Sequence, residues 1–278
     1  ALAKLKAMGL QAGHPEHFGD DSGYGVSRDD LAGNVMAARK ALTRRTLGRI
    51  NAAVERGAWD VSPITVAGFY EGPKNRVILT AAILQPPFFC AKGDVAANFG
   101  AIGSLIGHEF THGFDNNGRR YDSEGRLRDW WKAADAKAFA RRSQGLVRQY
   151  SRYAAVLDPM DPSKNVMVDG RLTLNENISD NGGARLAYMA LQRELADGEA
   201  YPPADGFSPE QRFFLALGQS LCARSGGEEW DRLMARSNKH SPERYKVNGV
   251  LSNMGEFQKA FSCRDTAPMV QDRPNRVW

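Results

Sequence analysis

The chain has 278 residues, of which 42% are apolar and 25% charged, and its formal net charge is +5. These values are typical of a soluble globular protein with one large domain or two small ones. A transmembrane helix is excluded within this sequence, because no apolar run approaches the roughly 20 residues that it needs. The chain opens at Ala1 without Met or a secretion signal, so we expect a processed product or a fragment whose signal or anchor lies upstream.

The positive charge gathers in one predicted helix, at Arg39, Lys40, Arg44, Arg45 and Arg49. Such clusters occur in helices that bind nucleic acid and in helices with one solvated face. Acidic residues are interspersed elsewhere, and no motif of stacking aromatic residues accompanies the cluster. We therefore favour a solvated face and expect no nucleic-acid partner.

The three cysteines, Cys90, Cys222 and Cys263, do not form the closely spaced pairs that a cysteine zinc cluster needs. Because their number is odd, they cannot all pair within the chain. Their count alone leaves the redox compartment open.

The first 60 residues are predicted to be mainly helical. A helix that ends near Gly9 is followed by a loop rich in Gly, Asp, His and Pro over residues 14–24. A second helix is expected to begin at Ser27, a residue suited to cap a helix, and to continue to about Glu55.

A strand pattern follows, and then a series of helices. Residues 64–84 alternate in polarity and are rich in Val, Ile, Phe and Tyr around a turn at 72–75, which predicts a hairpin of two short strands. Apolar spacing then predicts helices over 96–112, 132–153, 174–195 and 209–224, with shorter helical pieces from Ser241 and Asn253. The predicted fold class is mainly α with a small β-sheet (α+β).

The motif with the clearest chemistry is His108-Glu109-Phe110-Thr111-His112. Residues four apart lie on one face of a helix, so both imidazoles can reach one Zn²⁺ at about 2.0–2.1 Å. Glu109 then lies where its carboxylate can act as a general base. The alternative is an ordinary helix with two His facing core or solvent. Small apolar residues at 100–107 indicate a buried helix, and burying these polar groups is costly unless a metal satisfies them.

A catalytic zinc needs a third protein ligand and an open position for water. Glu176 and Asp180 lie four residues apart and so share a helix face. Glu176 can supply the ligand, while Asp180 can accept the free N–H of a ligating His, most simply His108. The alternative, a polar helix start with Asn and Asp as caps, fits this spacing equally well.

These motifs together resemble the neprilysin (M13) family of zinc peptidases. Further similar segments are Ile83-Leu-Gln-Pro-Pro-Phe-Phe89, Asn117-Gly118, Asp129-Trp130-Trp131, His240-Ser-Pro242 and Arg276-Val-Trp278. The segments follow the family's order and separations over essentially the whole chain. The resemblance implies a zincin fold, that is, a thermolysin-like catalytic domain.

The resemblance also implies roles for single residues. It implies one Zn²⁺ per chain with three protein ligands, His108, His112 and Glu176. Glu109 would activate water, Asp180 would support a ligand, and His240 would donate a hydrogen bond to the developing oxyanion. The alternative for His240 is a turn residue beside Ser-Pro. His14 and His17 match no such role and are expected to be ordinary loop residues.

Two positions depart from the family where it contacts substrate. The strand beside the substrate usually carries an Asn, which is replaced here by Ala67, followed by Gly68. The family's substrate-binding Arg is Lys246, which keeps the charge but loses the planar two-pronged geometry. We expect both changes to alter substrate preference and to leave metal binding intact.

The pocket for the substrate residue after the cut bond is expected to be roomy and apolar. Its walls would be Phe88, Leu105 and Leu221, although these residues can equally belong to the ordinary hydrophobic core.

On this resemblance the whole chain, 1–278, is the C-terminal catalytic portion of such a peptidase. Its parts would be a helical lead-in (1–60), substrate-side strands (61–90), the zinc helix (96–115), the third-ligand helix (172–196) and a C-terminal helical part (209–278). The N-terminal half that roofs the site in the family lies outside the sequence, and a separate chain would be a partner able to complete the site.

The resemblance carries two further expectations. Family cysteines at the positions of Cys222 and Cys263 commonly pair upstream, and the Cys before the terminal Arg-Val-Trp is Asn275 here, which suggests a bacterial form. We expect an extracytoplasmic location, which is periplasmic, secreted or membrane-anchored through an upstream segment.

The expected function is a zinc-dependent endopeptidase that hydrolyses peptides or small proteins. Two rivals remain at this stage. One is a zinc-containing protein that binds peptides but cleaves them poorly, for which Ala67 and Lys246 are the support. The other is a subunit that becomes an enzyme only when joined to its other half.

Overall fold

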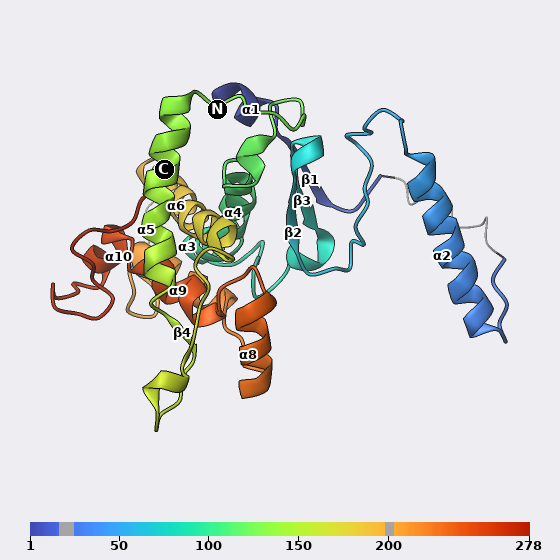
Figure 1. The fold of residues 1–278 in the computed structure, drawn as a ribbon. Helices are drawn as coiled ribbons and strands as arrows, with labels where there is room; N and C mark the ends of the chain where they lie inside the picture. Colours follow the sequence, from blue (N-terminus) through green and yellow to red (C-terminus); the bar gives the residue numbers. More distant parts are fainter. Residues whose placement is uncertain (17–24, 198–202) are drawn as a thin grey trace.

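The computed structural model describes residues 1–16, 25–197 and 203–278 and is mostly helical, with two small sheets (Figure 1). The predicted α+β class is therefore confirmed. Within the described residues, no helix combines the length and apolar character needed to cross a membrane. The three cysteine thiols are free.

The larger sheet has three strands in the order β1-β3-β2. β2 (Gly68–Glu71) and β3 (Arg76–Thr80) are antiparallel, so the predicted hairpin is confirmed. Every residue of β3 is buried, in keeping with its central place. β1 (Gly9–Gly13) pairs with β3 in parallel and is not predicted by the sequence pattern. Two of its five residues are Gly, and its partner lies far along the chain, so local sequence carries no strand signal there.

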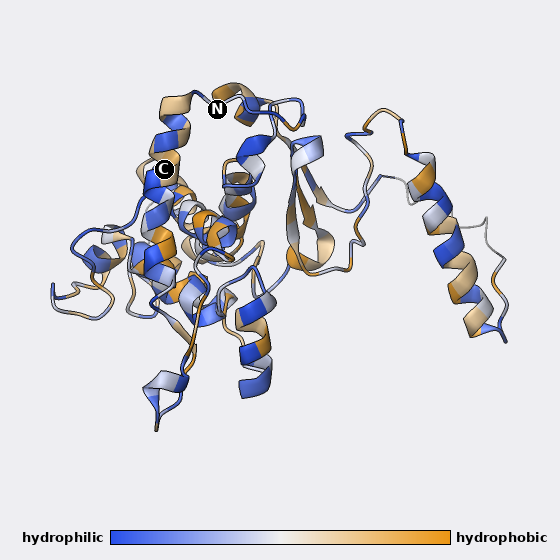
Figure 2. Cartoon of the chain, in the orientation of Figure 1, coloured by the Kyte–Doolittle hydropathy of each residue, from blue (hydrophilic) through white to orange (hydrophobic). Residues whose placement is uncertain are grey.

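The helix α2 (Leu31–Gly48) projects away from the rest of the molecule (Figure 1). It has no buried residue, and it begins where Asp30 Oδ1 accepts a hydrogen bond from Gly33 N at 2.7 Å. The predicted end near Glu55 is wrong, because the helix stops at Gly48, a weak helix former. Figure 2 shows apolar segments along this helix, and five large apolar side chains are exposed on it, Leu31, Val35, Met36, Leu42 and Leu47.

The predicted continuous helix over 96–112 is interrupted. It consists of α3 (Val95–Asn98), a π-helical turn η3 (Phe99–Gly103) and α4 (Ser104–His112). Gly100 lies directly against the backbone of Phe213, since a Cβ there would be 2.1 Å from the Phe213 carbonyl oxygen. The wider turn thus coincides with a very close contact with α7 (Pro209–Ser220), a tertiary constraint that apolar spacing does not reveal.

Seven further α-helices are described. They are α1 (Leu2–Lys6), α5 (Ala133–Tyr150), α6 (Leu174–Asp197), α7 (Pro209–Ser220), α8 (Glu228–Ser237), α9 (Glu243–Leu251) and α10 (Gly255–Ala260). Short 3-10 turns are η1 (Gly72–Lys74), η2 (Ala81–Ile83), η4 (Gly118–Arg120) and η5 (Pro162–Lys164). A second sheet pairs β4 (Ala154–Val156) with β5 (Val166–Met167). The sequence pattern predicts neither this sheet nor α8.

The long helix α6 lies between two parts of the hydrophobic core. One side packs with α7 and α9 through Leu191, Phe213 and Val250, and the other packs with α5 through Ile178 and Tyr150. Burying apolar area on both sides fixes the helix in the molecule. The N-terminal turns of α6, which carry Glu176 and Asp180, are therefore held rigidly beside α4.

Candidate metal centre and active site

Glycines allow α4 and α6 to approach each other closely. A Cβ on Gly107 would lie 2.6 Å from the Gly183 carbonyl oxygen, and a Cβ on Gly183 would lie 2.4 Å from His108 N. Gly182 faces Thr111 in the same way, at 2.6 Å from its Cγ2. Larger side chains would separate the helices, so these small residues bring the polar faces of α4 and α6 together.

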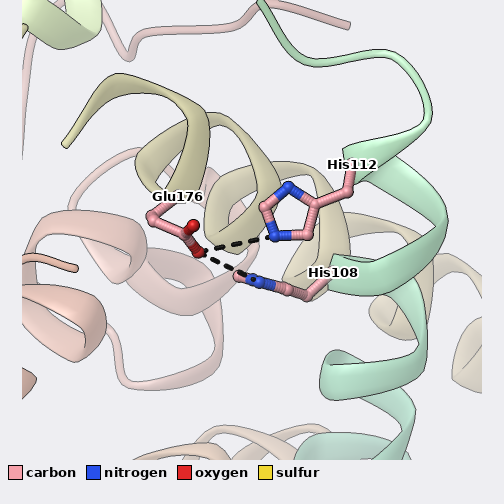
Figure 3. Close-up of side chains that lie close together, drawn as sticks. All are labelled: His108, His112 and Glu176. Atoms are coloured by element: carbon pink, nitrogen blue, oxygen red, sulfur yellow. Dashed lines mark ion pairs between the residues drawn. The ribbon is translucent and has the colours of Figure 1, made fainter. Parts of the chain in front are cut away.

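Three side chains from the two helices converge on one point (Figure 3). His108 Nε2 and His112 Nε2 each lie 3.4 Å from Glu176 Oε2, and one ligand atom from each residue falls within 4.8 Å of the others. The imidazoles come from successive turns of α4, and the carboxylate comes from the first turn of α6. The structure thus assembles a group of the kind that the sequence spacing predicts.

The buried oxygen of Glu176 tests whether this group fits a metal ion. Glu176 is 6% exposed, and within the described residues its Oε2 makes no hydrogen bond of good geometry although imidazole nitrogens surround it. A divalent cation between these atoms would satisfy them all. Two His and one Glu are a ligand set of catalytic zinc sites, with a further position left open. The residues therefore fit zinc.

A second carboxylate supports each imidazole from behind. His108 Nδ1 lies 2.8 Å from Asp180 Oδ1, and His112 Nδ1 lies 2.6 Å from Asp115 Oδ2. An imidazole that donates its Nδ1–H to a carboxylate presents a free Nε2 lone pair to a metal. The sequence suggests the Asp180 contact but misses the role of Asp115, although its place three residues after His112 is a local signal.

Glu109 lies between the metal-binding group and the sheet. It is buried, and a Cβ on Gly68 would be 3.0 Å from its Oε1, so the carboxylate packs closely against the backbone of β2. Both residues border a cavity of about 270 Å³. The same cavity is bordered by all the other residues expected to contact substrate, Ala67, Phe88, Leu105, Leu221 and Lys246.

Comparison with known proteins decides the family. Residues 67–277 match the model of peptidase family M13. This chain belongs to peptidase family M13. Neprilysin-11 of Caenorhabditis elegans is 34% identical to it over 289 residues, which cover 100% of this chain and 33% of that protein. Human endothelin-converting enzyme 1 is 39% identical over 238 residues, which cover 84% of this chain and 30% of that protein.

A solved structure shares the fold over the full chain. The crystal structure of Mycobacterium tuberculosis zinc metalloprotease Zmp1 in complex with an inhibitor is 36% identical and superposes with a TM-score of 0.91. The match covers 100% of this chain and 42% of that one. This M13 chain therefore has a zincin-like α+β fold and spans about a third of the length of the curated relatives it matches.

The charges of this M13 site are strongly coupled. Burial alone would lower the pKa of His112, but the neighbouring carboxylates of Asp115 and Glu176 raise it to about 10. Burial likewise opposes the shift at Glu176, whose pKa is held well below its ordinary value by His108, His112 and His240. The carboxylate is therefore ionised and ready to bind a cation, whereas the imidazoles must give up protons to do so.

The pKa of Glu109 moves in the opposite direction. Burial raises it, and the neighbouring His108 and His112 oppose the shift. A carboxylate with a raised pKa is a better proton acceptor near neutral pH, which is the property that a general base needs.

His240 lies beside the group formed by His108, His112 and Glu176. Its Nε2 is 3.2 Å from Glu176 Oε2, although half of its side chain is exposed to solvent. The next residue fixes this segment, because Ser241 Oγ donates a hydrogen bond of 2.7 Å to Asn177 Oδ1 on α6. His240 thus stands at the open side of the site.

The other two histidines lie apart from this centre. His14 is exposed on the segment after β1 and borders a separate cavity next to α2. His17 lies outside the described residues.

Proposed function

We propose that this chain is the catalytic portion of a zinc endopeptidase that hydrolyses peptide bonds of peptides or small proteins. One Zn²⁺ per chain would be held by His108, His112 and Glu176. The observation that carries the proposal is the buried Glu176 oxygen, which faces imidazole nitrogens at 3.2 to 3.4 Å and accepts no well-formed hydrogen bond within the described residues. Family membership supports zinc as the metal.

When bound, zinc would polarise the substrate carbonyl and increase the acidity of water. Glu109 accepts the proton from the attacking water and passes it to the leaving amine. Its burial and its position against Gly68 keep it beside the substrate strand. Asp180 and Asp115 hold the two imidazoles in one tautomer and orientation.

Substrate would bind along β2. Among the residues that the structure describes, this strand is at the edge of the sheet and pairs only with β3, so its outer edge can pair with an extended peptide. The side chain after the cut bond would enter the cavity between Phe88, Leu105 and Leu221. Without the family's Asn at Ala67, the substrate backbone loses a side-chain contact, and substrate choice depends more on this pocket.

His240 and Lys246 border the same cavity as Glu109. His240 would donate a hydrogen bond to the oxyanion as the carbonyl carbon becomes tetrahedral. Lys246 would contact a substrate carbonyl as a point charge, without the two-pronged geometry of Arg. Its charge also lowers the pKa of Asp180, together with His108 and against the effect of burial.

The test is hydrolysis of a quenched fluorescent peptide library by zinc-loaded wild type and Glu109→Gln. The substitution removes the base but none of the ligands, so zinc content should stay at one per chain while turnover falls about 10²- to 10⁴-fold. Equal turnover in both proteins would contradict the role of Glu109.

A different function is favoured if wild type and Glu109→Gln both bind zinc and neither cleaves any peptide. The chain spans about a third of its relatives, and α2 exposes apolar side chains. This outcome would favour a subunit that is active only when the N-terminal half that roofs the site in the family is present. A chain that carries this half would then be its partner. We propose an extracytoplasmic location for the whole protein.

A further inference from the structure

Lys4 is the most deeply buried cation of the described chain. The residue is 1% exposed, and its Nζ donates three hydrogen bonds to backbone carbonyl oxygens, at 2.6 Å to Gly113, 2.7 Å to Gly118 and 2.8 Å to Tyr121. All three acceptors lie more than 100 positions away in sequence. Lys4 therefore joins the N-terminal helix α1 to the loop that follows α4.

Aromatic rings complete the surroundings of this ammonium group. Its Nζ lies 5.5 Å from the ring centre of Tyr70, 5.4 Å from that of Phe114 and 6.0 Å from that of Trp130, distances that suit cation–π attraction. Burial lowers its pKa to about 8, while Asp115 and Asp122 oppose the shift. At neutral pH the group is therefore mainly charged.

The carbonyls that Lys4 binds belong to the loop that positions Asp115. Gly113 is the C-cap of α4, directly after His112, where a cation also interacts favourably with the helix dipole. Gly118 N donates 2.7 Å to Asp115 Oδ1, while Gly118 O accepts from Lys4. Asp115 Oδ2 contacts His112 Nδ1 at 2.6 Å. A continuous set of hydrogen bonds thus leads from Lys4 to a metal-binding imidazole.

The loop packs tightly against the end of α4. A Cβ on Gly118 would lie 1.7 Å from the His112 carbonyl oxygen, so the loop already lies as close to the helix end as a backbone can. Without the ammonium group, the Gly113 carbonyl loses its buried donor and the Gly118 carbonyl is left with the Tyr121 N–H at 3.0 Å. An unpaired buried acceptor such as the Gly113 carbonyl is costly. The loop would then move to find other donors and would take Asp115 with it.

We propose that Lys4 is a positioning residue of the metal centre, which holds the loop over residues 113–121 so that Asp115 orients His112. The inference rests on the proposed function, because it assigns Lys4 to the zinc site. It also makes the N-terminal segment part of that site, although the family match begins only at residue 67.

Zinc affinity of the 278-residue chain, measured by competition with a chelating dye, tests this. Lys4→Met removes the donors and keeps the length of the side chain. Loss of a group behind a ligand His typically costs about 10- to 100-fold in metal affinity, so we expect a loss in this range for Lys4→Met and for Asp115→Asn. Because both act through His112, the double variant should bind zinc as tightly as the weaker single variant.

The matched control is Arg76→Met. Arg76 is also buried and also donates to backbone carbonyls, those of Arg56 and Ala58, but it lies outside the contacts of Asp115. We expect it to lower the melting temperature and to leave zinc affinity within about two-fold of wild type. If Lys4→Met does not fold, Lys4→Gln, which keeps two N–H donors, is measured in the same way.

Three results would overturn the inference. The first is that Lys4→Met binds zinc as tightly as wild type. The second is that the losses of zinc affinity in the two single variants multiply in the double variant. The third is that Arg76→Met loses as much zinc affinity as Lys4→Met when the two variants have the same melting temperature. Failure of this inference can be distinguished from failure of the proposed function by the zinc binding of wild type and of His108→Ala. If wild type binds no zinc, or if His108→Ala binds it as tightly as wild type, the proposed function fails first.

Discussion

Asp122 illustrates how one buried carboxylate organises the loop that follows the metal-binding helix. Its Oδ1 accepts hydrogen bonds from the backbone N–H groups of Glu124 and Arg126, and its Oδ2 contacts Arg128 Nε at 2.6 Å. Burial alone would raise its pKa, but these hydrogen bonds hold it well below the ordinary value. The residues from Asp122 to Gly125 thus form a turn whose central carboxylate is satisfied by protein donors.

This shift predicts an acid-dependent loss of stability. Because the folded pKa of Asp122 lies below the unfolded value of about 3.9, its stabilising contribution is full above that pH and is lost as the pH falls through the folded pKa. Asp122→Asn should therefore lower the free energy of unfolding by about 1–3 kcal/mol at pH 7. Urea unfolding of both proteins should show this difference shrinking below about pH 4, and a constant difference would contradict the assignment.

Sequence spacing predicts that His108, His112 and Glu176 can converge, as they do in the structure, but it does not predict all of the residues that contact them. His108, His112 and Glu176 are recognisable because four-residue spacing on helices has a direct geometric meaning. The contact between Lys4 and Gly118 joins positions 114 apart and uses a backbone acceptor, so no side-chain pattern records it. The nearness of His240 to Glu176 likewise depends on tertiary packing between α6 and the segment before α9.

At the scale of helices, the approach of α4 to α6 determines the site. A Cβ on Gly183 would lie 2.4 Å from His108 N and 2.7 Å from the Ser104 carbonyl oxygen. Gly183→Ala should therefore push the helices apart, lower the free energy of unfolding by about 1–3 kcal/mol and weaken zinc binding. Denaturant unfolding and a zinc titration would measure the two effects.

Gly103→Ala is the matched control for this prediction. Its nearest contact would be 3.5 Å away, an ordinary van der Waals distance, and Ala is the better helix former. We expect equal or slightly higher stability and unchanged zinc affinity. Similar losses in the two variants would mean that close packing at Gly183 does not position the ligands.

The apolar periodicity of the sequence also explains which helices and strands can be predicted from it. The hairpin of β2 and β3 and the helices α5, α6 and α7 bury one face or both, so their periodicity is visible in the sequence. β1 has no such pattern, because its pairing with β3 joins distant segments. The π-turn before α4 coincides with a close contact with α7, which only the folded chain contains.

At the scale of the whole molecule, α2 stands apart from the metal centre. No residue of α2 is buried, whereas Gln11 Nε2 donates to Gly57 O at 3.3 Å, so the segments on either side of it meet near the sheet. Replacing residues 17–54 with a short Gly-Ser linker should therefore leave zinc affinity unchanged. It should also reduce self-association, because exposed apolar side chains are removed. Sedimentation and zinc titration would check both, and loss of zinc binding would show that α2 supports the site.

Anomalous diffraction at the zinc edge, from crystals grown with zinc, tests the proposed metal centre most directly. We predict one strong peak per chain, about 2.0–2.2 Å from His108 Nε2, His112 Nε2 and one Glu176 oxygen, with His240 unbound and a position left open. A peak at other residues, or a fourth bond from His240 that closes the coordination sphere, would contradict a catalytic zinc held by these three side chains.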